Sequence, residues 1–409
     1  MVDLARDVDG IPLQSQRDLR DRLKAGHDAG ATTPTVTIDR VASVDVLRGF
    51  AIFFIIAGDA LAWALYNLAS GMQGPASSIT LFFSQQLMHV DWEGFRFYDF
   101  LFPLFVFVTG ISIVLSLTRL VERDGKWAAH KRVLRRSFLL FALGVIYYGG
   151  ASTLWPEIRL LGVLQRIALC YLFASLLFLN LDLRGLIVAF VSLLVGYWAL
   201  MTFVPVPDIG AGSFGENANL ANWIDAQYLP GQLFYGEWDP EGLLSTLPAI
   251  ASCLLGVFAG ILLHQPRLEP AQKLLWFVVA GAMLIIVGLL WELQFPIIKK
   301  IWTSSFVLVA GGCSALLLAA LYLLVDIREQ KGWTTIFLWF GANAIALYMI
   351  NNIADFKTFA RRLVGGDISN FLDAYVMSGM GSLAVVAVAI ALAIAVAGFL
   401  YQRKIFLRV

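Results

Sequence analysis

Long apolar runs separated by short polar segments fill this chain from residue 41 onward. Each run reaches or approaches the roughly 20 residues that a helix needs to cross about 30 Å of hydrocarbon. The predicted spans are 44–68, 97–118, 134–150, 162–180, 185–205, 243–264, 273–292, 303–326, 334–354 and 382–402. The pattern therefore predicts an all-α polytopic integral membrane protein, a bundle of about ten transmembrane helices with both termini in the cytoplasm.

Composition supports this class and removes others. Hydrophobic residues make up 59% of the 409 residues and charged residues only 14%, which is outside the usual range of soluble domains. The net charge of +1 gives no reason to expect a nucleic-acid partner. The three cysteines, at 170, 253 and 313, lie inside apolar runs without metal-ligand spacing, so we expect neither a disulfide nor a metal site.

Residues 1–40 differ from the rest of the chain because they are polar and contain a cluster of charges. They show no apolar core of a cleavable signal peptide, so we expect the first span to act as its own insertion signal. The prediction is a cytoplasmic, partly disordered segment at 1–40, followed by a transmembrane domain at 41–409.

Basic residues concentrate in the predicted cytoplasmic loop 119–136. They are Arg119, Arg123, Lys126, Lys131, Arg132, Arg135 and Arg136. Most Lys and Arg residues of the chain fall on this predicted side, as the positive-inside rule requires for a cytoplasmic N-terminus. The cluster can serve topology alone, or it can also bind the phosphates of a cofactor, because Arg and Lys suit that chemistry.

The predicted outer loop 206–242 has the opposite character, with no Lys or Arg. Its acidic residues are Asp208, Glu216, Asp225, Glu237, Asp239 and Glu241, and its aromatic residues include Trp223, Tyr228, Phe234, Tyr235 and Trp238. Carboxylates attract an ammonium group and aromatic rings stack on a pyranose, so the loop could admit a cationic sugar. An ordinary interfacial aromatic belt explains the same pattern.

A titratable cluster stands at the mouth of the second predicted span. The sequence His89-Val-Asp-Trp-Glu-Gly places Asp91 and Glu93 beside a histidine and leads within ten residues to Asp99. Such groups are costly at a membrane unless they act on something, and an imidazole beside a carboxylate makes a general base. Asp59 lies deep in the first span without a neutralising neighbour, and we expect His89 to be its partner.

Other charged groups interrupt the apolar runs. Asp45 and Arg48 are three residues apart, so they can pair on one helical face, and Arg48 could also face a cofactor phosphate. Gln165 and Arg166 lie near the start of the fourth span, where an Arg must face the bundle interior. Arg166 could clamp a carboxylate such as Glu292 or line a cavity.

The ninth span adds neutral hydrogen-bonding groups. Asn343 and Tyr348 lie within it, and Asn351 and Asn352 follow. Uncharged donors and acceptors of this kind would suit a tunnel for a ligand.

Eight segments, in one order between residues 40 and 409, carry a family resemblance. They are Ser43-Val-Asp-Val-Leu-Arg-Gly, His89-Val-Asp-Trp-Glu-Gly, Asp99-Phe-Leu-Phe-Pro-Leu-Phe-Val-Phe, Arg136-Ser-Phe-Leu-Leu, Gly162-Val-Leu-Gln-Arg, Asp239-Pro-Glu-Gly-Leu-Leu-Ser-Thr, Trp302-Thr-Ser-Ser-Phe-Val and Arg403-Lys-Ile-Phe. Together they make the chain resemble the heparan-alpha-glucosaminide N-acetyltransferase family of transmembrane acyltransferases.

The resemblance implies that 41–409 is a transmembrane acyltransferase domain. It implies transfer of acetyl from cytoplasmic acetyl-CoA to the amine of a glucosamine on the far side of the membrane, with His89 at the position of the catalytic histidine. The extra first span and large luminal domain of the animal enzymes have no counterpart, which fits a bacterial inner-membrane relative, and dimeric relatives imply a homodimer. Asp59 stands where the family has asparagine, and Asn351 where it has histidine.

These considerations give the expected site. The catalytic candidates are His89, Asp59 and Asp99; the substrate-binding candidates are Trp92, Glu93, Asp239 and Glu241; the acetyl-CoA-binding candidates are Arg48, Arg136, Gln165, Arg166, Asn343 and Tyr348. His89 would act as general base or as a nucleophile that forms an acetyl-histidine. Asn343, Tyr348 or a backbone amide would stabilise the oxyanion.

Two other functions fit the same residues. A secondary transporter of an amino sugar or N-acetylglucosamine could use Asp59, Arg166 and Glu292 for proton coupling. An O-acetyltransferase of a cell-envelope glycan would need the same site with a hydroxyl acceptor.

Overall fold

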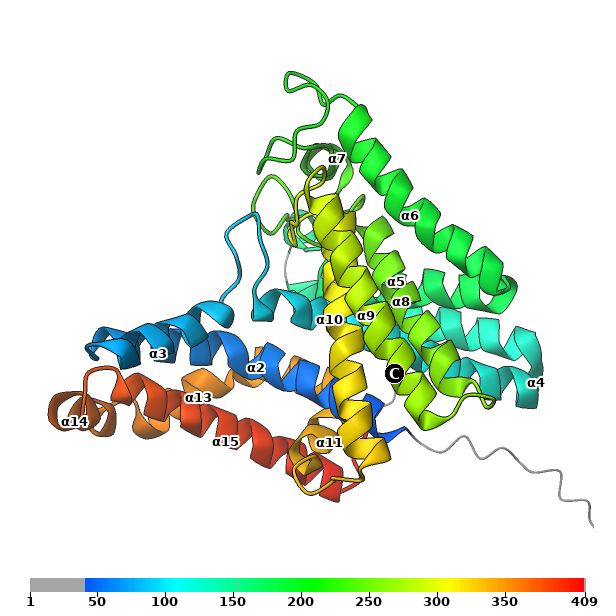
Figure 1. Ribbon diagram of the computed structural model, residues 1–409. Helices are drawn as coiled ribbons and strands as arrows, with labels where there is room; N and C mark the ends of the chain where they lie inside the picture. The colour runs from blue at the N-terminus through cyan, green and yellow to red at the C-terminus, as the bar shows by residue number, and fades with distance from the viewer. Residues whose placement is uncertain (1–40, 153, 408–409) are drawn as a thin grey trace, which may run out of the picture. The chain divides into compact units, whose positions relative to one another are not determined.

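Apolar helices dominate the computed structural model, which describes residues 41–407 apart from residue 153 (Figure 1). The predicted segment 1–40 lies outside the described residues. The long helices are α2 (Ala42–Ser70), α4 (Leu101–Tyr147), α5 (Val163–Asn180), α6 (Leu183–Phe203), α8 (Thr246–His264), α9 (Pro270–Glu292), α10 (Ser304–Leu321, continued by the π-helical turn η4, Tyr322–Ile327) and α15 (Met380–Gln402). The fold class is all-α and multi-pass, as predicted.

Shorter helices connect the long ones. They are α3 (Pro75–Gln86), α7 (Leu220–Tyr228), α11 (Thr335–Ala342), α12 (Ala344–Ala354), α13 (Phe356–Val364), α14 (Asp367–Tyr375) and the 3-10 turns η1 (Phe97–Phe100), η2 (Gly150–Ser152) and η3 (Trp155–Glu157). Among the described residues, eight helices are long and apolar enough to cross a membrane, or nine if α11 and α12, bent by 82°, form one span.

The prediction of ten separate spans differs from this count at one place. The predicted spans 97–118 and 134–150 correspond largely to the two helical parts of α4, which a kink at Gly125 separates. This stretch is counted once among the eight helices. Regular dihedral angles are interrupted only at Gly125, where φ is 82° and ψ is 170°. The charged segment 119–136 is therefore helical on both sides of a glycine break, because Lys, Arg and Glu are good helix formers even where they end an apolar run.

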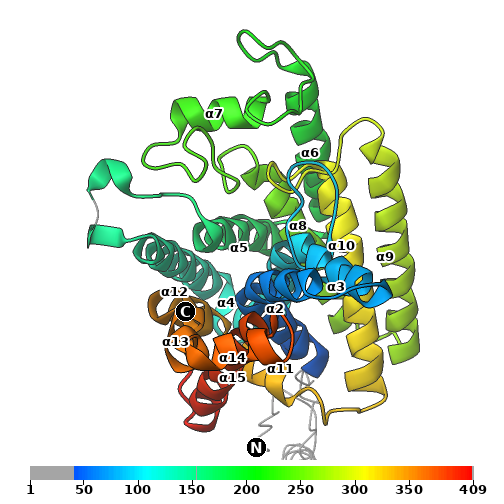
Figure 2. The same ribbon diagram turned by 90° about the vertical axis from the view of Figure 1, so that its left-hand side faces the viewer.

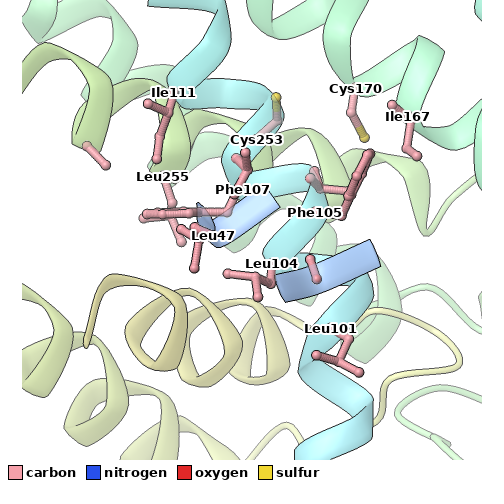
Figure 3. Packing of buried hydrophobic residues seen from close by; sticks show 14 of the residues in the cluster. Leu47, Leu101, Leu104, Phe105, Phe107, Ile111, Ile167, Cys170, Cys253 and Leu255 are labelled. Carbon is pink, nitrogen blue, oxygen red and sulfur yellow. The ribbon is translucent and has the colours of Figure 1, made fainter. Parts of the chain in front are cut away.

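The centre of the bundle is built by α4, α5 and α8, and Figure 3 shows the Leu, Ile and Phe side chains that pack there with the thiols of Cys170 and Cys253. Glycines let α4 and α8 approach closely. A Cβ atom on Gly110 would collide with the carbonyl oxygen of Cys253, and one on Gly256 would collide with that of Phe107. Small residues at a helix crossing are the usual way in which membrane helices gain contact.

Two groups of helices surround this centre (Figures 1 and 2). α2 packs against α3, α11 and α15, with α13 and α14 beside α15, while α9 packs against α10 and α6 against α8. At the start of α2 the backbone N–H groups of Ala42 and Ser43 donate to the Asp326 carboxylate, at 3.1 Å each. The predicted Asp45–Arg48 ion pair is confirmed at 3.1 Å.

The predicted acidic and aromatic loop 206–242 joins α6 to α8 and contains the helix α7. It lies at the top of Figure 1. Asn219 caps α7 by accepting the N–H of Asn222 at 3.0 Å. An isolated antiparallel bridge links Gly231 to Arg159, which precedes α5. The loop is thereby fastened to the helix ends where the candidate site residues lie.

Candidate active site

His89 lies in the turn between α3 and η1 and is held by Asp99. Asp99 is fully buried, and its Oδ1 lies 2.8 Å from Nδ1 of His89. Its Oδ2 accepts the backbone N–H groups of Arg96 (3.1 Å) and Val90 (3.4 Å), so the turn folds around this carboxylate. A carboxylate on Nδ1–H fixes the tautomer that leaves Nε2 as a base. Of the two carboxylates among the catalytic candidates, Asp99 is the one within hydrogen-bond distance of His89.

Two further side chains contact the imidazole. The Tyr98 ring lies with its centroid 4.7 Å from that of His89. Nζ of Lys299, from the segment between α9 and α10, lies 2.8 Å from Nδ1, 3.2 Å from Nε2 and 3.5 Å from Oδ1 of Asp99. His89 itself is half exposed, so a ligand can reach its ring.

A cavity of about 240 Å³ opens beside His89. Most of its lining residues are aromatic or charged. The residues that line it are His89, Val90, Asp99, Phe102, Tyr148, Arg159, Val163, Phe234, Tyr235, Pro240, Glu241, Lys299, Lys300 and Trp302. Sites for drug-sized ligands typically measure about 300–1,000 Å³, so this cavity suits a smaller unit, of the size of one sugar ring.

A buried ion-pair cluster forms one wall of the cavity. Arg159 binds Asp239 through two hydrogen bonds, of 2.7 and 2.6 Å, and Glu241 through a third of 2.6 Å. Its guanidinium lies between the rings of Tyr148 and Phe234, 4.6 and 4.7 Å from their centroids. The two carboxylates expected to bind substrate thus share Arg159 as their counter-ion, and of the two only Glu241 lines the cavity.

The other expected substrate groups lie farther out. Trp92 packs edge-on against Trp238 and donates its indole N–H to the carbonyl of Phe214 at 2.9 Å. These two rings and Tyr235 surround the ammonium of Lys300, which lies 4.8 Å from the Tyr235 centroid and 5.7 Å from that of Trp92. The aromatic groups expected to hold a cationic sugar therefore hold a lysine of the chain. Glu93 is exposed and does not line the cavity.

Asp59 lies apart from the His89 cavity. It lines a second cavity of about 210 Å³ between α2, α12, α13 and α15, together with Asn351 and Lys357. The Tyr98 ring packs against His89, and a Cβ atom on Gly58, the neighbour of Asp59, would also touch this ring. Asp59 acts on His89 only through its electric field. Asp59 and Asn351, the two positions where the chain departs from the resembled family, thus share one cavity.

The expected acetyl-CoA residues lie along α2, α4, α5 and the α11–α12 bend. Arg48 bonds Ser112 at 2.7 Å, the Arg136 guanidinium lies 4.6 Å from the Tyr171 centroid, and Tyr348 stacks on Tyr147 at 4.7 Å. Arg166 does not meet Glu292, which is exposed; it donates instead to Ser245 (2.5 Å) and the Gly242 carbonyl (3.2 Å), because that carbonyl and hydroxyl lie at the start of α8, against α5.

Several of these buried polar atoms lack a hydrogen-bond partner. They are Nε of Arg136, both amide atoms of Gln165, Nε and Nη1 of Arg166, and both amide atoms of Asn343. Buried polar groups are normally paired, and an exception calls for an explanation such as a ligand or water. Orphaned amide and guanidinium groups suit the amides and phosphates of acetyl-CoA, so the residues present fit this co-substrate. Within the described residues no group of three or more His, Cys, Asp and Glu side chains could hold a metal ion.

Burial and charge set the protonation of the site. Burial lowers the pKa of His89 below its usual value of 6.5; Asp99 opposes this and the ammonium of Lys299 reinforces it. Burial also lowers the pKa of Lys299, against the pull of Asp99 and Glu241. His89 is therefore a neutral base at physiological pH, and because its pKa is lowered, the neutral form persists into mildly acidic solution.

Lys299, Lys300 and Arg159 were not expected as site residues. Their position in the sequence could have indicated a role, because they are basic residues on the predicted outer side. The positive-inside rule leaves few Lys and Arg residues on that side. A basic residue in an outer segment is therefore a candidate for a structural or functional role.

Comparison with known proteins places these residues in a family. Residues 41–402 match the model of a family described as an acyltransferase domain. The chain belongs to this family. The acyltransferase is 27% identical over 367 residues to human heparan-alpha-glucosaminide N-acetyltransferase, covering 76% of this chain and 52% of the human protein. For the mouse enzyme of the same name the identity is 27% over 324 residues, covering 65% and 49%.

The acyltransferase spans about half the length of these curated relatives. The resemblance that the sequence motifs indicated is confirmed by both comparisons. They support an acyltransferase embedded in a membrane by many helices.

Proposed function

We propose that this acyltransferase moves the acetyl group of acetyl-CoA to the amine of a glucosamine-type sugar, with His89 as general base. The observation that carries the proposal is the Asp99–His89 pair at 2.8 Å beside a cavity of about 240 Å³. The name of the relatives supports N-acetyl transfer to a glucosaminide. We further propose a bacterial inner-membrane location and a homodimer.

The proposed reaction is direct transfer. An amine attacks a thioester only when it is deprotonated, and an amine with a pKa near the α-amino reference of about 7.7–8.0 is mostly protonated at neutral pH. The bound ammonium first releases one proton to water, and Nε2 of His89 then accepts a second proton as the neutral nitrogen attacks the carbonyl carbon. The tetrahedral adduct then collapses, the C–S bond breaks, and the CoA sulfur takes the proton from His89. Asp99 keeps Nδ1–H oriented throughout.

Acetyl-CoA would enter from the opposite end of the bundle. The phosphates would meet Arg48, Arg136 and the basic residues of 119–136, and the pantetheine amides would meet Gln165, Arg166 and Asn343. Tyr348, stacked on Tyr147, would border this path. The support is that buried polar atoms of Arg136, Gln165, Arg166 and Asn343 have no partner in the protein.

Gln165→Met tests this path. Replacing an unpaired buried amide with an apolar group of similar length is neutral or stabilising for the fold. If the amide binds acetyl-CoA, loss of one hydrogen bond worth about 0.5–1.5 kcal/mol should raise the KM for acetyl-CoA about 2- to 10-fold while the melting temperature stays the same or rises. An unchanged KM would remove Gln165 from the proposed path. Ser175→Ala, also on α5, is the matched control.

Purified protein in proteoliposomes tests the function itself. With labelled acetyl-CoA outside and glucosamine inside, or the reverse, acetylglucosamine should form only when the two are on opposite sides. Counterflow of unmodified sugar without acetyl-CoA consumption would instead establish the transporter. Products from hydroxyl acceptors alone would establish the O-acetyltransferase.

The same preparation separates the two roles of His89. Incubation with labelled acetyl-CoA and no acceptor, followed by fast quench, should trap no acyl-enzyme if His89 is a base. A labelled peptide containing residue 89 would establish the acetyl-histidine route.

A further inference from the structure

Lys299 is a cation held against the imidazole by a well-ordered turn. Its side chain is only 17% exposed. Two hydrogen bonds fix the segment that carries it: the N–H of Gly94 donates to the Ile297 carbonyl at 2.9 Å, and the N–H of Trp302 donates to the carbonyl of Lys299 at 2.9 Å. Gly94 belongs to the same turn as His89, so the histidine and the lysine are fastened to each other through the backbone.

The charges around Lys299 explain why a lysine can be buried there. Asp99 lies 3.5 Å from its Nζ, and Glu241, on the far wall of the same cavity, also attracts it. The carboxylate of Asp99 therefore serves two groups, His89 and Lys299. A buried ammonium beside a base is costly unless it acts on that base or on a ligand.

We propose that Lys299 is a catalytic residue for acetyl transfer: its ammonium lies against the His89 ring in the resting site and moves onto the thioester carbonyl oxygen as the amine attacks. This rests on the proposed function. In the resting site Nζ lies 2.8 Å from Nδ1 and 3.2 Å from Nε2 of His89. Because Nδ1–H donates to Asp99, the lone pair that can accept from Nζ is the one on Nε2. When the substrates bind, the amine takes its place at Nε2.

The reaction proceeds by addition of the amine and then loss of the thiolate. The amine lone pair forms the N–C bond, and the carbonyl π pair moves to oxygen. The negative oxygen accepts a hydrogen bond from Lys299, which keeps all three protons, while Nε2 of His89 accepts the proton of the amine. The oxygen pair then restores the carbonyl, the C–S bond breaks, and the thiolate takes the proton back from His89. Preorganised donors at an oxyanion commonly contribute about 10²–10³ in rate.

The charged groups that act on His89 come from several elements. Asp99 from η1 and Asp59 from α2 raise its pKa, and Lys299 lowers it. Arg96 donates to the carbonyl oxygen of His89 at 3.1 Å rather than to the ring. Across the cavity stand the Arg159–Glu241 pair and Lys300, none of which has a contact with the imidazole.

The first measurement follows the proton on His89 without any turnover. Diethylpyrocarbonate modifies only neutral imidazole, so the modification rate of the peptide containing His89, followed by mass spectrometry against pH, gives its pKa. We expect a midpoint below 6.5 in the wild-type protein and a rise of about one unit or more in Lys299→Met, because a nearby like charge disfavours the imidazolium. Lys300→Met should leave the midpoint near the wild-type value.

The second measurement follows the reaction. In Lys299→Met, kcat should fall about 10²–10³-fold with little change in the KM for the sugar, and Lys299→Arg should recover part of the loss. If Lys299→Met does not fold, Lys299→Gln, which keeps the length but not the charge, replaces it. If the midpoint of His89 modification in Lys299→Met equals that of the wild-type protein, the proposal for Lys299 is wrong, whether or not the protein acetylates sugars. If the midpoint shifts but the wild-type protein transfers no acetyl group, the proposed function is wrong instead.

Discussion

Replacing His89 with asparagine should lower acetyl transfer about 10²–10⁴-fold, the usual contribution of a general base. Asparagine is the informative choice because its amide nitrogen can take the place of Nδ1 and still donate to Asp99. The packing of the turn is then kept while the base at Nε2 is lost. Initial rates with saturating acetyl-CoA and glucosamine, alongside the melting temperature, measure the effect.

His130→Asn is the matched control. His130 is partly buried on α4, where it bonds the carbonyl oxygen of Lys126 at 2.8 Å and contacts the Asn180 amide at 3.3 Å. It does not line the His89 cavity, so its replacement should leave the rate within twofold. Asp99→Asn should also be slow, since its amide would present a donor to Nδ1 and favour the wrong tautomer. Wild-type rates in His89→Asn would show that another group is the base.

Arg159→Met should be the most destabilising single change at the site. It leaves the buried carboxylates of Asp239 and Glu241 without their counter-ion, and breaking a buried pair in this way costs about 3–5 kcal/mol. It also removes the guanidinium from between two rings. Thermal or denaturant unfolding in a fixed detergent, compared with wild type, measures the loss.

A compensating variant tests the cause. With Asp239→Asn and Glu241→Gln added to Arg159→Met, no unpaired charge remains. The amide oxygen introduced at position 239 can still accept a backbone N–H, as the carboxylate of Asp239 does from Phe234 and Glu241. Most of the lost stability should return. If the triple variant is no more stable than Arg159→Met, the cluster matters through packing rather than through charge.

The helices could be predicted because a long apolar run that crosses a membrane does so as an α-helix. The predicted loop 119–136 is mostly helical, and only the kink at Gly125 divides the helix there. The sequence offered both Asp59 and Asp99 as catalytic candidates beside His89, and the short turn of ten residues is what brings Asp99 to the ring. Asp59 was assigned to His89 from charge alone, and the sequence holds nothing that reveals that it lines a different cavity.

The rest of the site depends on contacts between distant segments. Lys299 meets His89 across 210 residues of sequence, and Arg159 meets Asp239 across 80. No periodicity or spacing links such pairs. Asp239 and Glu241 were recognised as important acids, but their partner could be identified only when the loop was seen folded against the segment before α5.

The long separation between His89 and Lys299 has a consequence for biosynthesis. Long-range contacts of this kind form late, and the ribosome must add roughly half of the chain after His89 before Lys299 exists. Until α9 and α10 have both entered the membrane, the histidine sits in a half-built cavity. A nascent or truncated acyltransferase that ends before this turn would thus bring its base into the membrane without being able to use it.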